Sequence, residues 1–265
     1  SNRRMSFFPF TTFGLYDVAA PPRPRPGWAL FLDFDGTLVD IAQQPEAIWV
    51  PPDLPDLLMR TSAALGGALA IVSGRPLSDI DRRLSPFKGP AAGEHGCGIR
   101  RSDGSKTETR EGVPPDVYAA LSALTKTHPG THVEAKPHSV AMHFRQAPEA
   151  ARALEAAMIA LETKSAGTLE LIQGSMVLEL RPRGHSKARA VMDLMCHAPF
   201  AGRRPIFVGD DIADEEGIAA CERMGGAGYN VHRSFAGRTA EVRLWLEAIA
   251  SDAGPALAAS TRAIR

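Results

Sequence analysis

The sequence predicts an α/β protein: a doubly wound, mostly parallel sheet with a smaller α+β segment inserted into it. Three observations predict this fold. Apolar runs at 29–32, 68–72 and 206–208 are continuous rather than alternating, which is typical of strands that are buried on both faces. Helical stretches separate these runs, as in βαβ units. The middle of the chain has a different order, helix and hairpin repeated twice.

The chain is expected to begin with an extension over residues 1–27, before the folded core. Residues 20–27 read APPRPRPG, with four prolines in eight residues, which is typical of a stiff, extended spacer. The folded core should therefore start at Trp28.

The catalytic core is predicted to consist of residues 28–112 and 184–265. Its first part alternates strands and helices, expected at 29–32, 55–65, 68–75 and 77–84. Its second part repeats this alternation, with elements expected at 186–195, 204–211, 213–221, 226–231 and 240–249. The Ala- and Ser-rich tail from Ser251 is expected to fray.

The inserted segment, residues 113–183, is predicted to form a cap domain with an antiparallel sheet. Its helices are expected at 114–127, which begins with proline, and at 148–163, which is rich in Ala, Leu and Glu. One hairpin is expected from strands 131–135 and 140–144, and a second from 169–172 and 176–180, with a tight turn at 173–175.

The composition excludes several classes of protein. Lys plus Arg equals Asp plus Glu, at 30 each, so the overall basic field of many nucleic-acid-binding proteins is absent. The three cysteines form no C-x-x-C pair, and no disulfide framework is expected. The sequence has no run of about 18 apolar residues, so no membrane span is expected. The first residues, SNRRMSFFPFTTFG, lack the features of a signal peptide, so a cytoplasmic location is expected.

Polar clusters follow three of the predicted core strands. These are Asp33 to Thr37, Ser73-Gly74-Arg75 and Gly209-Asp210-Asp211. Because ligands of open parallel sheets bind at the carboxyl ends of the strands, the three clusters should meet at one edge. Gly209-Asp210-Asp211 alone would be equally compatible with an ordinary turn, and Ser73 alone with a helix cap, whereas the five residues from Asp33 to Thr37, which follow a buried apolar strand, are stronger evidence.

The acids of these clusters predict a magnesium site. Asp33 and Asp35 are two residues apart, which on a strand places both on one face, and Gly36 then allows a sharp turn. Asp210 adds a third carboxylate, with Asp211 and Asp214 close by. Carboxylates that gather in this way repel each other and need a cation or a proton between them, and Mg²⁺ suits such a cluster because it prefers oxygen ligands.

An anion is expected beside this metal. Ser73 and Gly74 combine a hydroxyl group with a freely turning backbone before a predicted helix, an arrangement that binds phosphate. Lys187 lies at the start of another helix and could neutralise phosphate oxygens.

Taken together, these motifs resemble the haloacid dehalogenase superfamily of phosphotransferases. The matching segments occur in that superfamily's order: DFDGTL at 33–38, SGR at 73–75, Lys187 and GDD at 209–211. Three further segments are similar to the trehalose-6-phosphate phosphatases, and the likeness spans roughly residues 28–245. They are AGEHGCGIR (92–100), VEAKPHSVAMHFR (133–145) and LELRPRGHSKARA (178–190).

The resemblance implies specific roles for residues of the core. Asp33 would be the nucleophile and Asp35 the general acid and base; the reverse assignment disagrees with the family. Thr37, Ser73 and Gly74 would hold phosphate oxygens together with Lys187. The implied metal set consists of Asp33, the backbone carbonyl of Asp35, Asp210, Asp211 and Asp214, the last two as supporting residues.

The resemblance also implies a sugar site in and near the cap. Glu134, Lys136 and Glu179 look like the family's ligands for sugar hydroxyls, although each could equally be a solvated charge on a hairpin. The further candidates are Arg75, Glu94, His95, Gly96, His143 and Arg145. The chain departs from the family pattern at Phe144, where tyrosine is frequent, and at Ala213, where threonine is usual.

The expected function is therefore Mg²⁺-dependent hydrolysis of trehalose 6-phosphate through an aspartyl-phosphate intermediate, in trehalose biosynthesis. The resemblance also implies a functional link to a trehalose-6-phosphate synthase, and the protein is expected to be a monomer. Three alternatives remain open: a phosphatase for sucrose 6-phosphate or a mannosyl phosphate, a sugar phosphomutase, and a non-catalytic sugar-phosphate sensor. Retention of Asp33, Asp35, Lys187 and Asp210 argues against the sensor.

Overall fold

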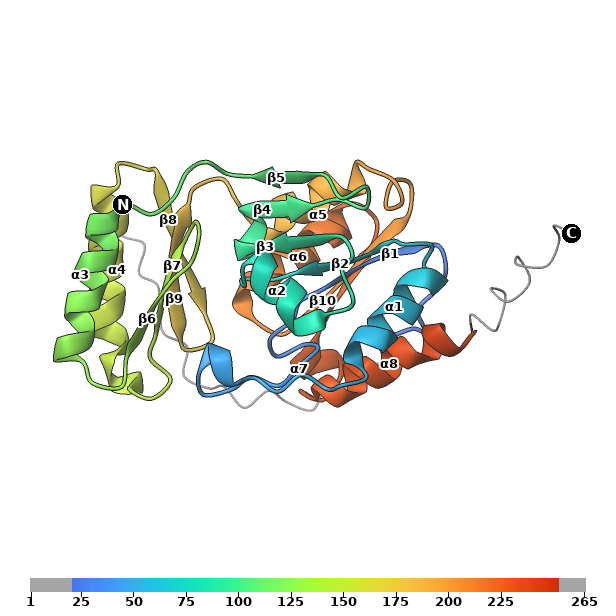
Figure 1. Cartoon of the computed structure of the whole chain (residues 1–265), viewed down its shortest axis with the longest axis horizontal. Coiled ribbons are helices and arrows are strands. Elements are labelled where there is room, and N and C mark those ends of the chain that lie inside the picture. The colour runs from blue at the N-terminus through green and yellow to red at the C-terminus, as the bar shows by residue number, and fades with distance from the viewer. Residues whose placement is uncertain (1–20, 253–265) are drawn as a thin grey trace, which may run out of the picture.

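The structure is a computed structural model that describes residues 21–252. Within this range the chain forms two sheets with separate hydrophobic cores (Figure 1). Residues 1–20 of the predicted extension and the end of the predicted tail lie outside the described residues. Between residues 21 and 252, no helix has the length and apolar character needed to cross a membrane.

The larger sheet has the strand order β11-β10-β1-β2-β3-β4-β5. Strands β11 to β3 in this order run parallel, and β4 and β5 extend the sheet antiparallel. The strands are β1 (Trp28–Leu32), β2 (Leu69–Val72), β3 (Ala91–Gly93), β4 (Gly98–Arg100), β5 (Lys106–Glu108), β10 (Arg204–Gly209) and β11 (Ala227–Asn230).

Strand β1 explains why the apolar runs are continuous. Its side chains alternate between two cores: Leu30 and Leu32 pack on one face of the sheet, and Phe31 packs on the other. There the ring of Phe31 stacks on that of Phe200, with the ring centroids 5.4 Å apart. All are fully buried, because helices cover both faces. The prediction of a doubly wound core is confirmed.

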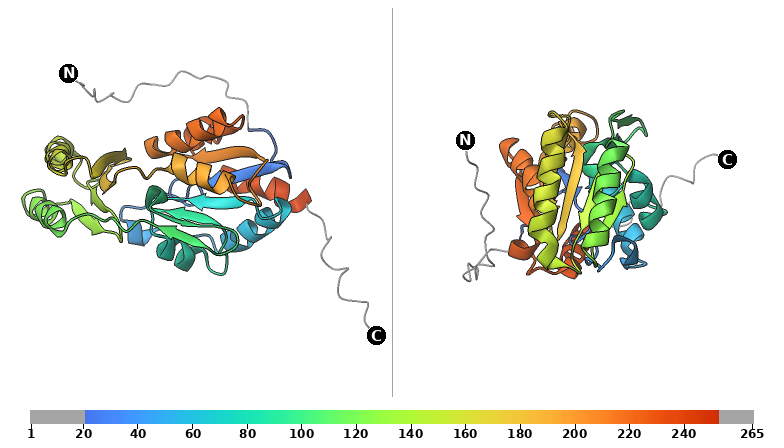
Figure 2. Two further views of the ribbon diagram at one scale, coloured as in Figure 1. Left: turned by 90° about the horizontal axis from the view of Figure 1, so that it is seen from above. Right: turned by 90° about the vertical axis from the view of Figure 1, so that its left-hand side faces the viewer.

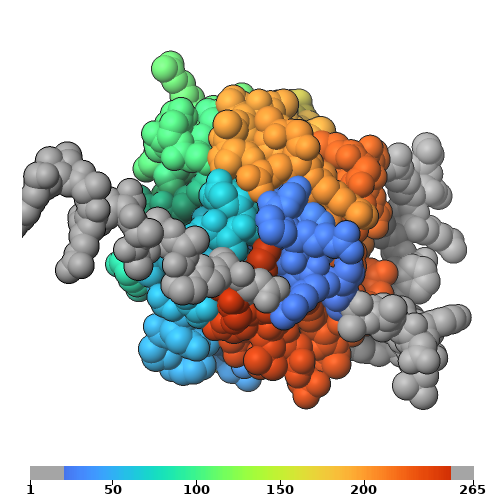
Figure 3. Space-filling model, turned by 90° about the vertical axis from the view of Figure 1, so that its right-hand side faces the viewer, coloured from blue at the N-terminus to red at the C-terminus, as the bar shows by residue number. Residues whose placement is uncertain are grey.

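The helices of the core divide between the two faces of this sheet. One face packs against α1 (Leu54–Ala64), α2 (Leu77–Leu84), α7 (Val231–Ser234) and α8 (Thr239–Asp252). The other face packs against α5 (Lys187–Met195) and α6 (Ile212–Arg223). Figure 3 shows the end of the core that faces away from the smaller sheet, where the first described residues (blue) lie beside α8 (red). There the indole of Trp245 donates to the carbonyl of Pro22 at 3.0 Å.

The smaller sheet is antiparallel, with the order β6-β7-β9-β8. Its strands are β6 (His132–Ala135), β7 (Val140–His143), β8 (Leu169–Gly174) and β9 (Val177–Pro182). Helices α3 (Pro115–Thr127) and α4 (Ala151–Lys164), the latter preceded by the 3₁₀ turn η3 (Pro148–Ala150), lie side by side over its outer face (Figure 2). This unit is the cap that the sequence predicts as an α+β insertion.

Two details of the predicted elements are wrong. Strands β3, β4 and β5 were not predicted, because each has only three residues and none is an apolar run. β3 has small residues, β4 has a single isoleucine beside the buried Arg100, and β5 has exposed polar residues. The turn of the second cap hairpin is shorter than the predicted 173–175. Gly174 still pairs with Val177, so only Ser175 and Met176 form the turn, and Met176 has a positive φ of 62°.

Candidate active site

The carboxyl ends of three neighbouring strands bring the polar clusters together. Strand β1 lies between β10 and β2, with Leu32 opposite Val208 on one side and Ile71 on the other. Asp33, Ser73 and Asp210 follow these strands and line one cavity, which is covered by the cap. The expectation that the strand ends share one edge of the sheet agrees with this geometry.

Three acids gather around one point beneath the cavity. Oxygen atoms of Asp33, Asp210 and Asp214 all lie within 4.8 Å of one another. Lys187 Nζ contacts two of these side chains, at 2.8 Å from Asp33 Oδ1 and 2.5 Å from Asp214 Oδ1. Burial opposes the charge on Lys187, but the two carboxylates outweigh it and raise the pKa of the ammonium group. Lys187 is therefore a permanent cation beside Asp33.

The electrostatics of this cluster fit a divalent cation. Burial, together with the charge of Asp214, raises the pKa of Asp33 well above its usual value. Burial and the neighbouring acids Asp214 and Asp211 raise the pKa of Asp210 to about 7. One lysine therefore does not balance the acids, and a hard cation with oxygen ligands would relieve the remaining repulsion.

Gly36 makes this cluster possible. It has a positive φ of 76°, and a Cβ atom there would lie 2.1 Å from Asp210 Oδ2. Thr37 is close by and fully buried, and its hydroxyl donates to Asp210 Oδ1 at 3.4 Å. Thr37 thus faces the acids and is not among the residues that line the cavity.

Asp211 and Asp214 support the loop after β10. They form a capping box at the start of α6, in which Asp214 Oδ2 accepts from the amides of Asp210 and Asp211 at 3.0 Å. Asp214 therefore has one oxygen on Lys187 and the other on the backbone. Asp211 lies apart from the acid cluster, and its Oδ2 accepts from the amide of Ser175 in the cap at 2.8 Å.

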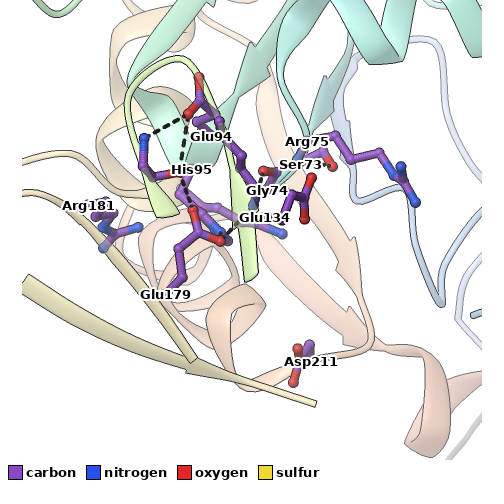
Figure 4. A network of polar contacts seen from close by, with 12 residues as sticks. Ser73, Gly74, Arg75, Glu94, His95, Glu134, Glu179, Arg181 and Asp211 are labelled. Atoms are coloured by element: carbon purple, nitrogen blue, oxygen red, sulfur yellow. Dashed lines mark hydrogen bonds and ion pairs between the residues drawn. The ribbon is translucent and has the colours of Figure 1, made fainter. Parts of the chain in front are cut away.

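Asp35 is held by Arg75. The guanidinium group donates twice to the Asp35 carboxylate, each time at 2.7 Å, and once to Asp79 at 2.8 Å. Burial opposes its charge, but the two acids raise the pKa of Arg75. Arg75 lines the cavity, yet Figure 4 shows its guanidinium group directed away from the cap residues Glu134 and Glu179.

Ser73 and Gly74 belong to the loop that follows β2, which the sequence predicts to bind phosphate and which is here called the phosphate loop. Ser73 is buried, and its hydroxyl oxygen accepts from the amide of Arg75 at 3.1 Å. Helix α2 has Pro76 as its N-cap, so Ser73 does not cap this helix. The imidazole of His95 packs against Gly74 so closely that a Cβ atom there would lie 2.6 Å from His95 Nε2.

The cap contributes a charged group above this loop. Lys136 Nζ donates to Glu179 Oε2 at 2.7 Å and to the carbonyl of Gly74 at 2.9 Å. His95 Nε2 lies 3.5 Å from the same Glu179 oxygen. Burial alone would raise the pKa of Glu179, but Lys136 and His95 hold it well below its usual value. Burial lowers the pKa of His95, although the neighbouring Glu179 carboxylate opposes this shift.

The remaining cap candidates also line the cavity. Glu134 Oε2 lies 2.8 Å from His143 Nε2, and despite burial this contact lowers the pKa of the carboxyl. Arg145 donates to the carbonyl of Ser175 at 3.1 Å. Phe144, which lies between His143 and Arg145 in the sequence, is buried in the cap core and does not reach the cavity.

Two predicted sugar ligands lie outside the cavity lining. Glu94 directs its carboxylate to the cap backbone, and Gly96 packs against the carbonyl of Ser186. Sequence reasoning missed Ser139, which lies between Glu94 and Glu179, and the apolar residues Ile41 and Met176, which also line the cavity. A serine in a predicted turn gave no signal, and neither did single apolar residues in loops.

Known proteins resemble this chain over most of its length. A family model described as trehalose-phosphatase matches residues 31–239. A probable trehalose-phosphate phosphatase of Sinorhizobium fredii is 40% identical over 205 residues, which cover 77% of each chain. Trehalose-6-phosphate phosphatase of Escherichia coli is 37% identical over 207 residues, with the same coverage.

The fold also has solved counterparts. The C-terminal domain of Candida albicans trehalose-6-phosphate phosphatase superimposes with a TM-score of 0.71 at 18% identity, covering 84% of this chain and 92% of that one. A trehalose-6-phosphate phosphatase related protein gives a TM-score of 0.68 at 22% identity, covering 84% and 97%. At these identities the likeness concerns the fold alone.

Proposed function

The chain belongs to the trehalose-phosphatase family, and on that premise we propose that it hydrolyses trehalose 6-phosphate to trehalose and inorganic phosphate. One observation carries the proposal. The buried carboxylate of Asp33 lies beside Lys187 at the bottom of a cavity whose opposite wall, in the cap, presents Glu134, Lys136 and Glu179. A phosphate-transfer site below and a polyol site above fit a sugar phosphate.

The first step of the proposed reaction forms an aspartyl phosphate. A carboxylate oxygen of Asp33 attacks phosphorus as the bond from phosphorus to the sugar oxygen breaks. Asp35 enters this step protonated and gives its proton to that leaving oxygen. Asp35 lines the same cavity, and Arg75 holds it through two bonds; one of these is given up when the carboxyl group carries the proton, and the other keeps it oriented.

The second step returns the enzyme to its starting state. Asp35, now ionised, takes a proton from a water molecule, whose oxygen attacks phosphorus. The bond from phosphorus to Asp33 breaks, and inorganic phosphate leaves with the Asp33 carboxylate restored.

Charge on the phosphoryl group is balanced by the chain's own residues. Lys187 neutralises the oxygens nearest Asp33, and Ser73 presents a buried hydroxyl group from the neighbouring strand end. We propose that Asp33, Asp210 and the Asp35 backbone carbonyl hold Mg²⁺, with Asp214 and Asp211 orienting the loop. When bound, Mg²⁺ would supply further positive charge to the phosphoryl oxygens.

The cap residues are proposed to select the sugar. Ionised Glu179 and Glu134 accept from hydroxyl groups, and Lys136 donates to them. A role in trehalose biosynthesis, a link to a trehalose-6-phosphate synthase, a cytoplasmic location and a monomeric state stay predictions.

The test is phosphate release from trehalose 6-phosphate, glucose 6-phosphate and sucrose 6-phosphate, with Mg²⁺ and with EDTA. We expect release from trehalose 6-phosphate alone, only with Mg²⁺. Metal-dependent release from a different sugar phosphate would retain the mechanism and reject the substrate. Transfer of phosphate to a second sugar position without release would indicate a mutase.

A further inference from the structure

Glu94 connects the core to the cap. It follows β3 in the 3₁₀ turn η2 (Glu94–Gly96), and the residue is 3% exposed. Its Oε1 accepts from two cap backbone amides, His138 at 2.9 Å and Ser139 at 3.1 Å. These amides belong to residues 136–139, the turn between β6 and β7, here called the docking turn. Figure 4 shows Glu94 directed toward it.

The docking turn continues this contact into the sugar site. The hydroxyl group of Ser139 lies 3.1 Å from Glu94 Oε1 and 2.6 Å from Glu179 Oε1. Glu179 binds Lys136, which in turn reaches the Gly74 carbonyl of the phosphate loop. A single hydrogen-bonded path therefore leaves the core at Glu94, crosses the cap, and returns to the core at Gly74.

The backbone at Glu94 supports a role beyond packing. Glu94 and His95 both have positive φ angles, 46° and 56°, which side-chain-bearing residues rarely adopt. Such strain persists where surrounding contacts hold it and is frequent at functional sites. Here it directs the Glu94 carboxylate toward the docking turn and the His95 ring toward Gly74 and Glu179.

We propose that Glu94 is a positioning residue that docks the turn 136–139 onto the core and so places Lys136 and Glu179 above the phosphate loop. A buried carboxylate that loses its donors is unfavourable, so the docked arrangement is stabilised whenever the cap covers the site. This inference deepens the proposed function, since the two placed residues are its sugar ligands. The docking contact itself does not depend on the identity of the substrate.

The direct test is hydrogen–deuterium exchange of the docking-turn amides in the full chain. We expect Glu94→Ala to lower the protection of residues 138 and 139 by about tenfold or more, because their acceptor is lost. Glu94→Gln keeps a carbonyl acceptor and should give an intermediate loss. Glu222→Gln, at an exposed position on α6, is the matched control and should leave exchange unchanged.

The functional readout compares a large with a small substrate. Turnover of a sugar phosphate requires the docking turn to place Lys136 and Glu179 correctly. Turnover of p-nitrophenyl phosphate, which has no sugar, should depend on this placement less. In Glu94→Ala, kcat/KM should therefore fall at least about tenfold more for trehalose 6-phosphate than for p-nitrophenyl phosphate. If this variant does not fold, Ser139→Ala, which removes the bridging hydroxyl group only, should show the same preference.

Two results would overturn the inference. Unchanged exchange at 138 and 139 would mean that Glu94 does not hold the turn. An equal loss of kcat/KM for both substrates would mean that Glu94 affects the phosphate-transfer residues or the stability of the whole protein. If the unmodified protein releases no phosphate from trehalose 6-phosphate, the proposed function fails, while the exchange experiment still decides whether Glu94 docks the cap.

Discussion

Arg75 clamps Asp35 with two parallel bonds, from Nε to Oδ2 and from Nη2 to Oδ1, both 2.7 Å long. Both partners are partly buried, and Arg75 is itself fixed by Asp79. A planar guanidinium group provides this two-bond geometry and a lysine ammonium group cannot. The clamp orients the proposed acid, whatever leaving group the phosphate carries.

Replacing Arg75 should therefore impair the chemical step for every substrate. We expect Arg75→Lys to lower kcat by about tenfold or more, because one charge remains but the orientation of Asp35 is lost. Steady-state rates on trehalose 6-phosphate and p-nitrophenyl phosphate test this, and the two losses should be similar. Full activity of Arg75→Lys would show that Asp35 needs no clamp.

Asp33→Asn should abolish turnover without destabilising the protein. The amide cannot form the aspartyl phosphate, so we expect a loss of about 1,000-fold or more in kcat. Burial and neighbouring acids raise the pKa of Asp33, so removing this charge relieves repulsion, and the melting temperature in EDTA should not fall. Acid-quenched native enzyme should carry a phosphoryl group on the Asp33 peptide, and the variant none. Turnover by the variant near the native rate would reject the assignment.

Lys187→Met should destabilise the fold. It leaves Asp33 and Asp214 buried without their cation, and breaking buried pairs in this way costs about 3–5 kcal/mol. Denaturant unfolding in EDTA measures the effect. Lys164→Met, at an exposed position, should change stability by no more than about 0.5 kcal/mol. Similar small effects in both variants would contradict a structural role for Lys187.

The metal-free protein should lose stability as pH rises. Asp210 has a pKa of about 7 in the native state against the ordinary 3.8. Below about pH 4 it is protonated whether the chain is folded or not; above that, the unfolded state ionises first, and the native state is progressively disfavoured up to about pH 7. Asp210→Asn removes this penalty, which reaches about 4 kcal/mol above pH 7.

Thermal melts of both proteins in EDTA across pH 5 to 8 test this, at roughly unit steps. The advantage of Asp210→Asn should grow with pH, and adding Mg²⁺ should reduce it by stabilising the native protein. If the melting temperatures of the two proteins changed with pH in the same way, ionisation of Asp210 would not destabilise the native state.

Gly36→Ala should disturb the acid cluster in addition to straining the backbone. Alanine at this positive φ costs about 1 kcal/mol, and its Cβ would also collide with Asp210. Gly202→Ala is the matched control, because Gly202 has a φ of 77° and open space around it. Only Gly36→Ala should lose phosphatase activity and metal affinity, measured by Mg²⁺ titration. Equal behaviour of the two variants would remove the steric argument.

The sequence by itself determined the two-part fold and the common edge at which the acids meet. Continuous apolar runs, such as the one before Asp33, indicate strands that are buried on both faces of a sheet. The carboxyl ends of parallel strands must then lie together, so Asp33, Ser73 and Asp210 could be placed near one another without coordinates.

Only the tertiary structure decided which partner each polar side chain has. Glu94 and Ser139 are 45 residues apart, and Asp35 and Arg75 are 40 apart, and no periodicity links either pair. The short strands β3 to β5 likewise depend on neighbours in the sheet rather than on their own residues. Local patterns record which face of an element is buried, whereas a hydrogen bond between distant segments depends on how the packed elements bring them together.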